Sequence, residues 1–393
     1  MENLLIALLS ALLILIASML SVELGLSVAL IEITMGIVGG NFLALHTTPW
    51  IDFLASFASI VLTFLAGAEV DTDLMREKFK ESLWIGGLSF LFPFLGAMAF
   101  AYWGLGWDAR ASQIAGVALS TTSLAVVYAV LVETGLTHTP LGKLIMAATF
   151  VTDFGTALAL SVLFIQPSLN ILWFIGVSIA LIVLMPRLAP PFFARYGNRV
   201  IEPEIKLIFV ALFVLMFFGE LGASHAVLPA FILGLAMSKR LTQERAQQQR
   251  LRVVTFALLT PFFFFKSGMN VSLSAVLQNW SWLLLLLGVK LAAKFVGVYP
   301  VSRRYVEPHA WYTTLLMSTG LTFGTISSLY GLNAGILDRA QFSVLITVVV
   351  LSAVVPTFIA QRFFSPALPD PAVPASTATA ALPAQAAVSE AAD

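Results

Sequence analysis

The chain contains a long series of apolar segments, each close to the length that crosses a lipid bilayer. An α-helix needs about 20 apolar residues to span the hydrocarbon core, and Gly, Pro or polar residues punctuate such segments. They lie at 3–20, 25–44, 50–68, 82–103, 112–132, 141–165, 169–188, 204–221, 225–238, 253–267, 281–301, 310–330 and 340–361. Charged residues are 11% of the 393 residues, against about 25% in soluble domains. The sequence therefore predicts an all-α polytopic membrane protein with about 13 transmembrane helices.

Residues 1–364 are expected to form one transmembrane unit. Residues 365–393 are rich in Pro, Ala, Ser and Thr and have too little apolar bulk to offset the entropy of ordering, which predicts a disordered tail. With the N-terminus outside, sixteen of the 21 Lys and Arg residues fall on the inner side and three on the outer side. Because cytoplasmic loops carry the excess of basic residues, we expect a cytoplasmic C-terminus in a bacterial inner membrane.

Two of the apolar segments contain polar runs that are unusual at membrane depth. Residues 120–123 are four consecutive hydroxyl residues, and the sequence MSTGLTFGTISS places Gly320 and Gly324 among Ser and Thr. Discontinuous helices at matching positions of two halves indicate a transporter ion site. The runs fall in the fifth helix of two six-helix repeats, 1–6 and 8–13, which an odd linker helix would relate as inverted repeats. The alternative is that small and hydroxyl residues only allow close helix packing.

Asp153 is the sole acid in the apolar run 141–165 and lies at its midpoint. An acid at this depth usually faces a water-filled cavity and binds ions or protons. A carboxylate oxygen suits a monovalent cation such as Na+ or K+, and burial favours the protonated acid, so both ions compete for one group. Thr152 diverges from it by about 100° around the helix and would shape the edge of the site. A structural role for Asp153, as a cap or a lysine partner, is the alternative.

Lys290 and Lys294 lie four residues apart in the segment 281–301 and therefore share a helix face. Lys294 is nearer the middle and is the expected partner of Asp153, with Lys290 the second choice. Such a lysine would release a proton when Asp153 takes a cation. The alternative is that one of the two extends to the headgroups at the membrane surface.

At this point the chain resembles the monovalent cation:proton antiporter-2 family, relatives of bacterial Na+/H+ antiporters and K+ efflux proteins. The matching stretches cover most of residues 55–360 and read FLAGAEVDTDLM, ALSTTSLAVVYAVLVETGL, AATFVTDFGTALA, HAVLPAFILGLAMS, PFFFFKSGMNVSL and KFVGVYPVSR. The resemblance implies crossed discontinuous helices, a dimerisation domain, a mobile core domain, an elevator-like movement and a homodimer.

The resemblance also implies site residues. The ion and proton carrier matches Asp153, the hydroxyl of the broken helix matches Thr122 with Thr121 beside it, and the basic residue matches Lys294. Electrogenic members carry two adjacent acids where this chain has Thr152 and Asp153. A single carboxylate favours electroneutral exchange of one Na+ or K+ for one H+.

Other classes fit less well. A sodium-coupled organic-anion symporter of similar fold is the alternative function, although it would need a roomier polar cavity. Intramembrane proteases are poor fits. An aspartyl protease needs two acids at membrane depth, and a serine protease needs a histidine at that depth. No metal cofactor is expected, because the chain has no Cys and its four His residues are scattered. The formal net charge is zero and does not point to nucleic acid, so no nucleic-acid partner is expected.

Replacing Asp153 by Asn removes the titrating charge and keeps the volume. We expect Asp153→Asn to abolish cation-dependent proton flux and to leave a folded, membrane-inserted dimer. Flux in reconstituted vesicles and size-exclusion chromatography measure the two properties. Near-normal flux in the variant would show that Asp153 is not the carrier.

Overall fold

The computed structural model describes residues 2–24, 27–70, 77–137, 139–164, 169–197, 199–222, 224–243 and 245–366, and all regular elements in these ranges are helices. In the first half they are α1 (Glu2–Leu24), α2 (Val28–Phe42), α3 (Pro49–Ala68), α5 (Phe79–Ala99), η1 (Phe100–Gly104), α6 (Ala109–Ser120), α7 (Leu124–Glu133), α8 (Pro140–Leu163) and α9 (Asn170–Tyr196). In the second they are α10 (Pro203–Leu221), α11 (Val227–Gln243), α12 (Arg245–Val254), η2 (Thr255–Leu259), α13 (Thr260–Met269), α14 (Leu273–Gln278), α15 (Trp280–Tyr305), α16 (Ala310–Met317), α17 (Thr322–Asn333) and α18 (Arg339–Phe363). The elements η1 and η2 are single π-helical turns.

The predicted membrane architecture is confirmed. Nine helical segments of the described residues are long and apolar enough to span a bilayer, and α2, α10, α11 and the interrupted pair α16–α17 complete the thirteen expected segments. Three boundaries differ from the prediction by five residues or more, because α9 runs to Tyr196, α11 runs to Gln243 and α12 begins at Arg245. These extra turns carry Arg, Gln or Pro residues, so a search for apolar runs stops short of them although the helix continues. The predicted tail, 367–393 in particular, lies outside the described residues.

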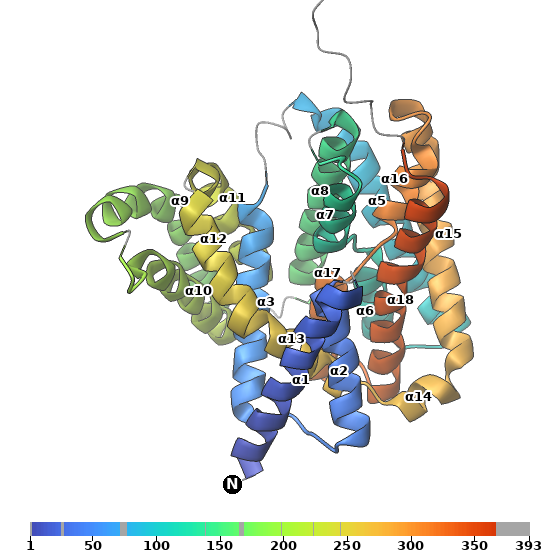
Figure 1. Ribbon diagram of the computed structural model, residues 1–393, viewed down its shortest axis with the longest axis horizontal. Coiled ribbons are helices and arrows are strands. Elements are labelled where there is room, and N and C mark those ends of the chain that lie inside the picture. Colours follow the sequence, from blue (N-terminus) through green and yellow to red (C-terminus); the bar gives the residue numbers. More distant parts are fainter. Residues whose placement is uncertain are drawn as a thin grey trace, which may run out of the picture.

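The helices form two bodies. We call α1–α3 and α9–α13 the panel body, in which α3 packs on α11 and α2 on α13. The core body comprises α5–α8 and α15–α18, with α5 packed on α6, α8 and α15. Figure 1 shows α3 and α9–α12 on one side and α5, α7, α8, α15 and α16 on the other. The helices α8 and α11 make the main helix contact between the bodies.

Two close helix crossings in the panel body repeat one arrangement. A Cβ atom added to Gly67 of α3 would overlap the carbonyl oxygen of Phe231, and one added to Gly234 of α11 would overlap that of Phe64. On α2 and α13, Gly36 and Gly268 meet the carbonyl oxygens of Phe265 and Ile33 in the same way. The crossing of α3 with α11 joins the third and ninth predicted segments. The crossing of α2 with α13 joins the second and tenth segments. Exchange of the two six-helix repeats converts one pair into the other, as inverted repeats require.

The close crossing generates a prediction about stability. Gly67→Ala forces a methyl group against the backbone of α11, and overpacking of this kind costs about 1–3 kcal/mol. We expect a clearly lower melting temperature for the detergent-purified variant. Gly87→Ala on α5 is the control, because no atom lies within 4 Å of the added Cβ. Equal melting temperatures for both variants would contradict the tight crossing.

Candidate functional site

The two predicted polar runs are interruptions in helices, and they lie against each other. Residues 121–123 separate α6 from α7, and residues 318–321 separate α16 from α17. The Thr122 hydroxyl donates to the carbonyl oxygen of Met317 over 2.9 Å, and the Ser123 amide donates to Thr319 Oγ1 over 3.3 Å. Both interruptions are fully buried at the centre of the core body. The structure therefore contains the crossed discontinuous helices that the sequence predicts.

The crossing brings four helix ends together. The C-terminal ends of α6 and α16, at Ser120 and Met317, carry partial negative charge, whereas the N-terminal ends of α7 and α17 carry partial positive charge. A cation is stabilised near the first pair of ends and an anion near the second. Lys294 and Asp153 of the core body follow this division.

Lys294 of α15 occupies the negative side of the crossing. Its fully buried ammonium group donates to Ser89 Oγ over 2.8 Å, to the Ser120 carbonyl oxygen over 2.9 Å and to Thr122 Oγ1 over 3.1 Å. Three acceptors match the three N–H donors of an ammonium group. Lys294 thus satisfies the carbonyl group at the end of α6 and holds the first interruption against α5 and α15.

Lys290 lies one helical turn away and contacts the second interruption instead. Its ammonium group donates to Ser352 Oγ of α18 over 2.7 Å, and it borders Gly320 so closely that a Cβ there would lie 2.5 Å from Nζ. The same Cβ would lie 2.7 Å from the hydroxyl oxygen of Thr121. Both lysines are fully buried, so neither extends to the membrane surface.

Asp153 of α8 lies on the positive side of the crossing. Its side chain is 2% exposed, and its Oδ1 atom has no hydrogen-bond partner within the described residues. It lines a cavity of about 90 Å³ together with Thr122 and with Leu124 and Thr322, the first residues of α7 and α17. The partial positive charge of these two helix ends favours an ionised carboxylate here. The arrangement offers a buried carboxylate and a hydroxyl oxygen to a small cation.

Two expected neighbours of Asp153 lie elsewhere. Within the described residues, no hydrogen bond or ion pair joins Asp153 to Lys294, and the two groups interact only at longer range through their charges. Thr152 does not line the cavity, because its hydroxyl group donates to the carbonyl oxygens of Ala148 and Gly86 and so joins α8 to α5. Adjacent residues of a helix point about 100° apart, so Thr152 faces α5 while Asp153 faces the cavity.

The cavity reaches the surface at one end of the bundle. Its mouth is lined by Glu69, at the end of α3, and Arg252 of α12, whose side chains form an ion pair of 3.2 Å and are 23% and 44% exposed. We call this the Arg252 end. At the opposite end, a separate pocket of about 520 Å³ is lined by polar residues that include Ser56, Glu220, His225 and Asn333.

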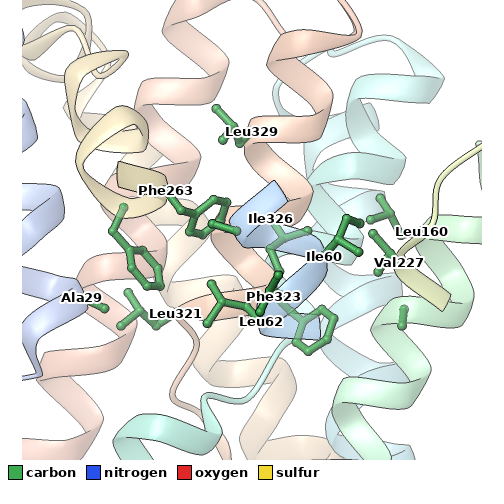
Figure 2. Packing of buried hydrophobic residues seen from close by; sticks show 14 of the residues in the cluster. Ala29, Ile60, Leu62, Leu160, Val227, Phe263, Leu321, Phe323, Ile326 and Leu329 are labelled. Carbon is green, nitrogen blue, oxygen red and sulfur yellow. The ribbon is translucent and has the colours of Figure 1, made fainter. Parts of the chain in front are cut away.

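An apolar layer separates the cavity from the opposite pocket. Leu62 of α3 and Phe323 of α17 line the cavity, whereas Ile60 and Ile326 of the same helices line the pocket. All four side chains are buried in one cluster, which Figure 2 shows from close by. A hydrated ion cannot cross this layer without losing its water. Among the described residues, the cavity of Asp153 therefore reaches the surface at the Arg252 end, and these apolar side chains lie between it and the opposite pocket.

His225 in the opposite pocket does not carry a positive charge near pH 7. Its ring lies edge-on to Tyr330 with 4.1 Å between ring centroids, and burial lowers the pKa of His225 to about 4. The imidazole is therefore neutral near pH 7 and cannot repel an incoming cation.

Sequence reasoning missed two groups that hold the site. Ser89 of α5 accepts from Lys294, and the backbone carbonyl group of Met317 accepts from Thr122. Ser89 is the one Ser or Thr among residues 83–103 of an apolar run, which is the one signal that points to it. A backbone carbonyl group leaves no trace in the sequence.

Comparisons with known proteins identify the class. The family model described as "Sodium/hydrogen exchanger, transmembrane" matches residues 7–365. The chain is 28% identical over 355 residues to the "Probable Na(+)/H(+) antiporter 3" of Methanocaldococcus jannaschii, covering 86% of this chain and 89% of that protein. It is 23% identical over 354 residues to the "Na(+)/H(+)-K(+) antiporter GerN" of Bacillus cereus, covering 86% and 90%.

The fold matches a solved antiporter structure. The sodium proton antiporter MjNhaP1 of Methanocaldococcus jannaschii superposes with a TM-score of 0.71 at 13% identity, covering 93% of this chain and 100% of that one. With the helices and the crossing described above, the family match defines a membrane antiporter. The chain belongs to the transmembrane sodium/hydrogen exchanger family.

The geometry of Thr122 generates a prediction. Thr122→Val removes the oxygen that accepts from Lys294 and lines the cavity of Asp153, at nearly constant shape. We expect the half-saturation concentration of the cation to rise about tenfold, as for loss of one hydrogen bond of about 1.4 kcal/mol, with a smaller change in maximal rate. Cation titrations of proton flux give both quantities.

Thr156→Val is the matched control. Thr156 is a buried threonine of α8 whose hydroxyl donates to the Thr152 carbonyl oxygen, away from the cavity. An unchanged half-saturation concentration in Thr122→Val would show that residues 120–123 only pack helices.

Proposed function

We propose that this chain exchanges a monovalent cation, Na+ or K+, for H+, with Asp153 as the shared carrier. The observation that supports it is the placement of a buried carboxylate, one oxygen of which has no hydrogen-bond partner among the described residues, in a cavity that reaches the Arg252 end, with apolar side chains between it and the pocket at the other end. A group accessible from one side at a time is what coupled exchange requires. The relatives described above are a probable Na+/H+ antiporter and, for GerN, an Na+/H+-K+ antiporter.

Each site residue has a proposed role. The carboxylate of Asp153 and the hydroxyl group of Thr122 supply oxygen ligands, and a proton on Asp153 excludes the cation. Lys294 offsets the negative helix ends and favours the ionised form of Asp153 through its charge. Thr121 and Lys290 stabilise the second interruption, and Thr152 holds α8 on α5, so these three shape the site without touching the ion.

We further propose how the site changes sides. The core body carries Asp153, both interruptions and both lysines, whereas the panel body supplies Ile60 and Leu62 of the apolar layer. An elevator-like movement of the core body along the panel body would carry Asp153 past this layer. Because one carboxylate carries either ion, one cation exchanges for one proton and the cycle is electroneutral.

The setting follows from the motifs and the charge distribution. We place the chain in the cation:proton antiporter-2 branch, as a homodimer in a bacterial inner membrane, with the N-terminus outside and residues 365–393 as a disordered cytoplasmic tail. The Arg252 end is then cytoplasmic. Symport of an organic anion is disfavoured, because a cavity of about 90 Å³ around Asp153 holds only a small ion.

Reconstitution tests the function directly. Protein in proteoliposomes with a pH-sensitive dye in the lumen should move protons when Na+, K+ or Li+ is added, and Asp153→Asn should not. The order of response among the cations gives the selectivity. If folded wild-type protein moved no protons with any of these cations, the proposal would be wrong.

The two lysines generate a separate prediction. Lys294→Gln removes a positive charge near Asp153, so protons compete better with the cation, and the pH profile of exchange should shift upward by about one unit. Lys290→Gln should shift it less, because Lys290 contacts the second interruption. A larger shift for Lys290→Gln would reverse the assignment.

Wild-type exchange should not respond to an imposed membrane potential, and a clear response would show that a second group carries a proton.

A further inference from the structure

An ion pair lies at the mouth of the Asp153 cavity, and the exchange mechanism proposed above does not use it. Among the described residues that line the cavity, the charged ones are Asp153, Glu69 and Arg252. Glu69 follows the last residue of α3, and its Oε1 atom lies 3.2 Å from Arg252 Nε in an ion pair. Both belong to the panel body, so the pair stays in place while the core body moves.

A second ion pair on α12 is similar to the Arg252–Glu69 pair in length and exposure but lies outside the cavity. Arg250 of α12 pairs with Glu202 over 3.2 Å, and these side chains are 36% and 28% exposed. The length and exposure are close to those of the Arg252–Glu69 pair, yet neither Arg250 nor Glu202 lines the cavity. Position, and not the presence of an ion pair, distinguishes Glu69 and Arg252.

The pair presents opposite charges to an ion on its way to Asp153. A guanidinium group at the mouth repels a cation, and a carboxylate there attracts it. The Glu69 side chain is 23% exposed, so its charge is less screened by water and salt than that of a fully exposed acid. A cation that loses part of its hydration shell at the mouth can take the Glu69 oxygen that Arg252 holds.

We propose that Glu69 is a loading site for the transported cation and that Arg252 occupies this site when the cation is absent. The cation then passes from Glu69 to Asp153 and Thr122 in two steps. This inference rests on the proposed cation exchange. It predicts that the pair sets the apparent affinity for cations arriving from the Arg252 end and leaves the other end unaffected.

The test measures exchange separately from each face, in right-side-out and inside-out membrane vesicles. Glu69→Gln should raise the half-saturation concentration about fivefold from the Arg252 end, and Arg252→Gln should lower it by a similar factor, since one charge near the path contributes about 1 kcal/mol in a partly screened setting. From the opposite end both variants should stay within about twofold of wild type. The double variant should return towards wild type, because the net charge at the mouth is restored.

Glu202→Gln and Arg250→Gln are the matched controls, since they make the same charge changes at the pair outside the cavity. A purely structural role for Glu69 would lower the maximal rate from both ends and would not reverse sign in Arg252→Gln. Half-saturation values that match the controls would overturn the loading site while leaving exchange intact. Absence of exchange in wild-type protein would instead overturn the proposed function, so the two failures are distinguishable.

Discussion

Backbone groups that a broken helix releases at membrane depth must find partners inside the protein, and the core body is organised around this constraint. The Ser120 carbonyl group accepts from Lys294, and the Met317 carbonyl group accepts from the hydroxyl group of Thr122. Neither bond forms unless α6–α7, α15 and α16–α17 meet at one point. The need to satisfy a few polar groups therefore determines where five helices cross, and the candidate site lies at that crossing.

The same crossing explains how the carboxylate of Asp153 and the ammonium group of Lys294 are tolerated in an apolar interior. Lys294 lies at the C-terminal end of α6, and Asp153 lines a cavity with the N-terminal ends of α7 and α17. Each charge thus faces helix ends of opposite partial charge. Because Asp153 keeps an unpartnered oxygen and no direct ion pair to Lys294, its carboxylate remains available to an ion from the cavity.

The panel body and the core body have different roles in the transport that we propose. The panel body is joined by the paired glycine crossings of α2 with α13 and α3 with α11, where the backbones touch and leave little freedom. The core body contacts it largely through apolar side chains such as Phe323 and Ile60. Apolar contacts are non-directional, so they resist sliding less than hydrogen bonds of fixed geometry do. In the elevator-like movement that we propose, the glycine crossings make the panel body the rigid wall, and the apolar layer is the surface along which the core body moves.

The sequence by itself determined the membrane class, the thirteen segments and the polar runs, because apolar length and acids at membrane depth are local properties that bilayer energetics makes conspicuous. It also indicated Asp153, Thr122 and Lys294. The tertiary structure alone decided that Lys294 binds the end of α6 instead of pairing with Asp153, and that Thr152 faces α5. It also brought Ser89, the Met317 carbonyl group and the Glu69–Arg252 pair to the site. These depend on contacts between segments up to 205 residues apart, and spacing along a chain carries no record of which side chains a crossing brings together.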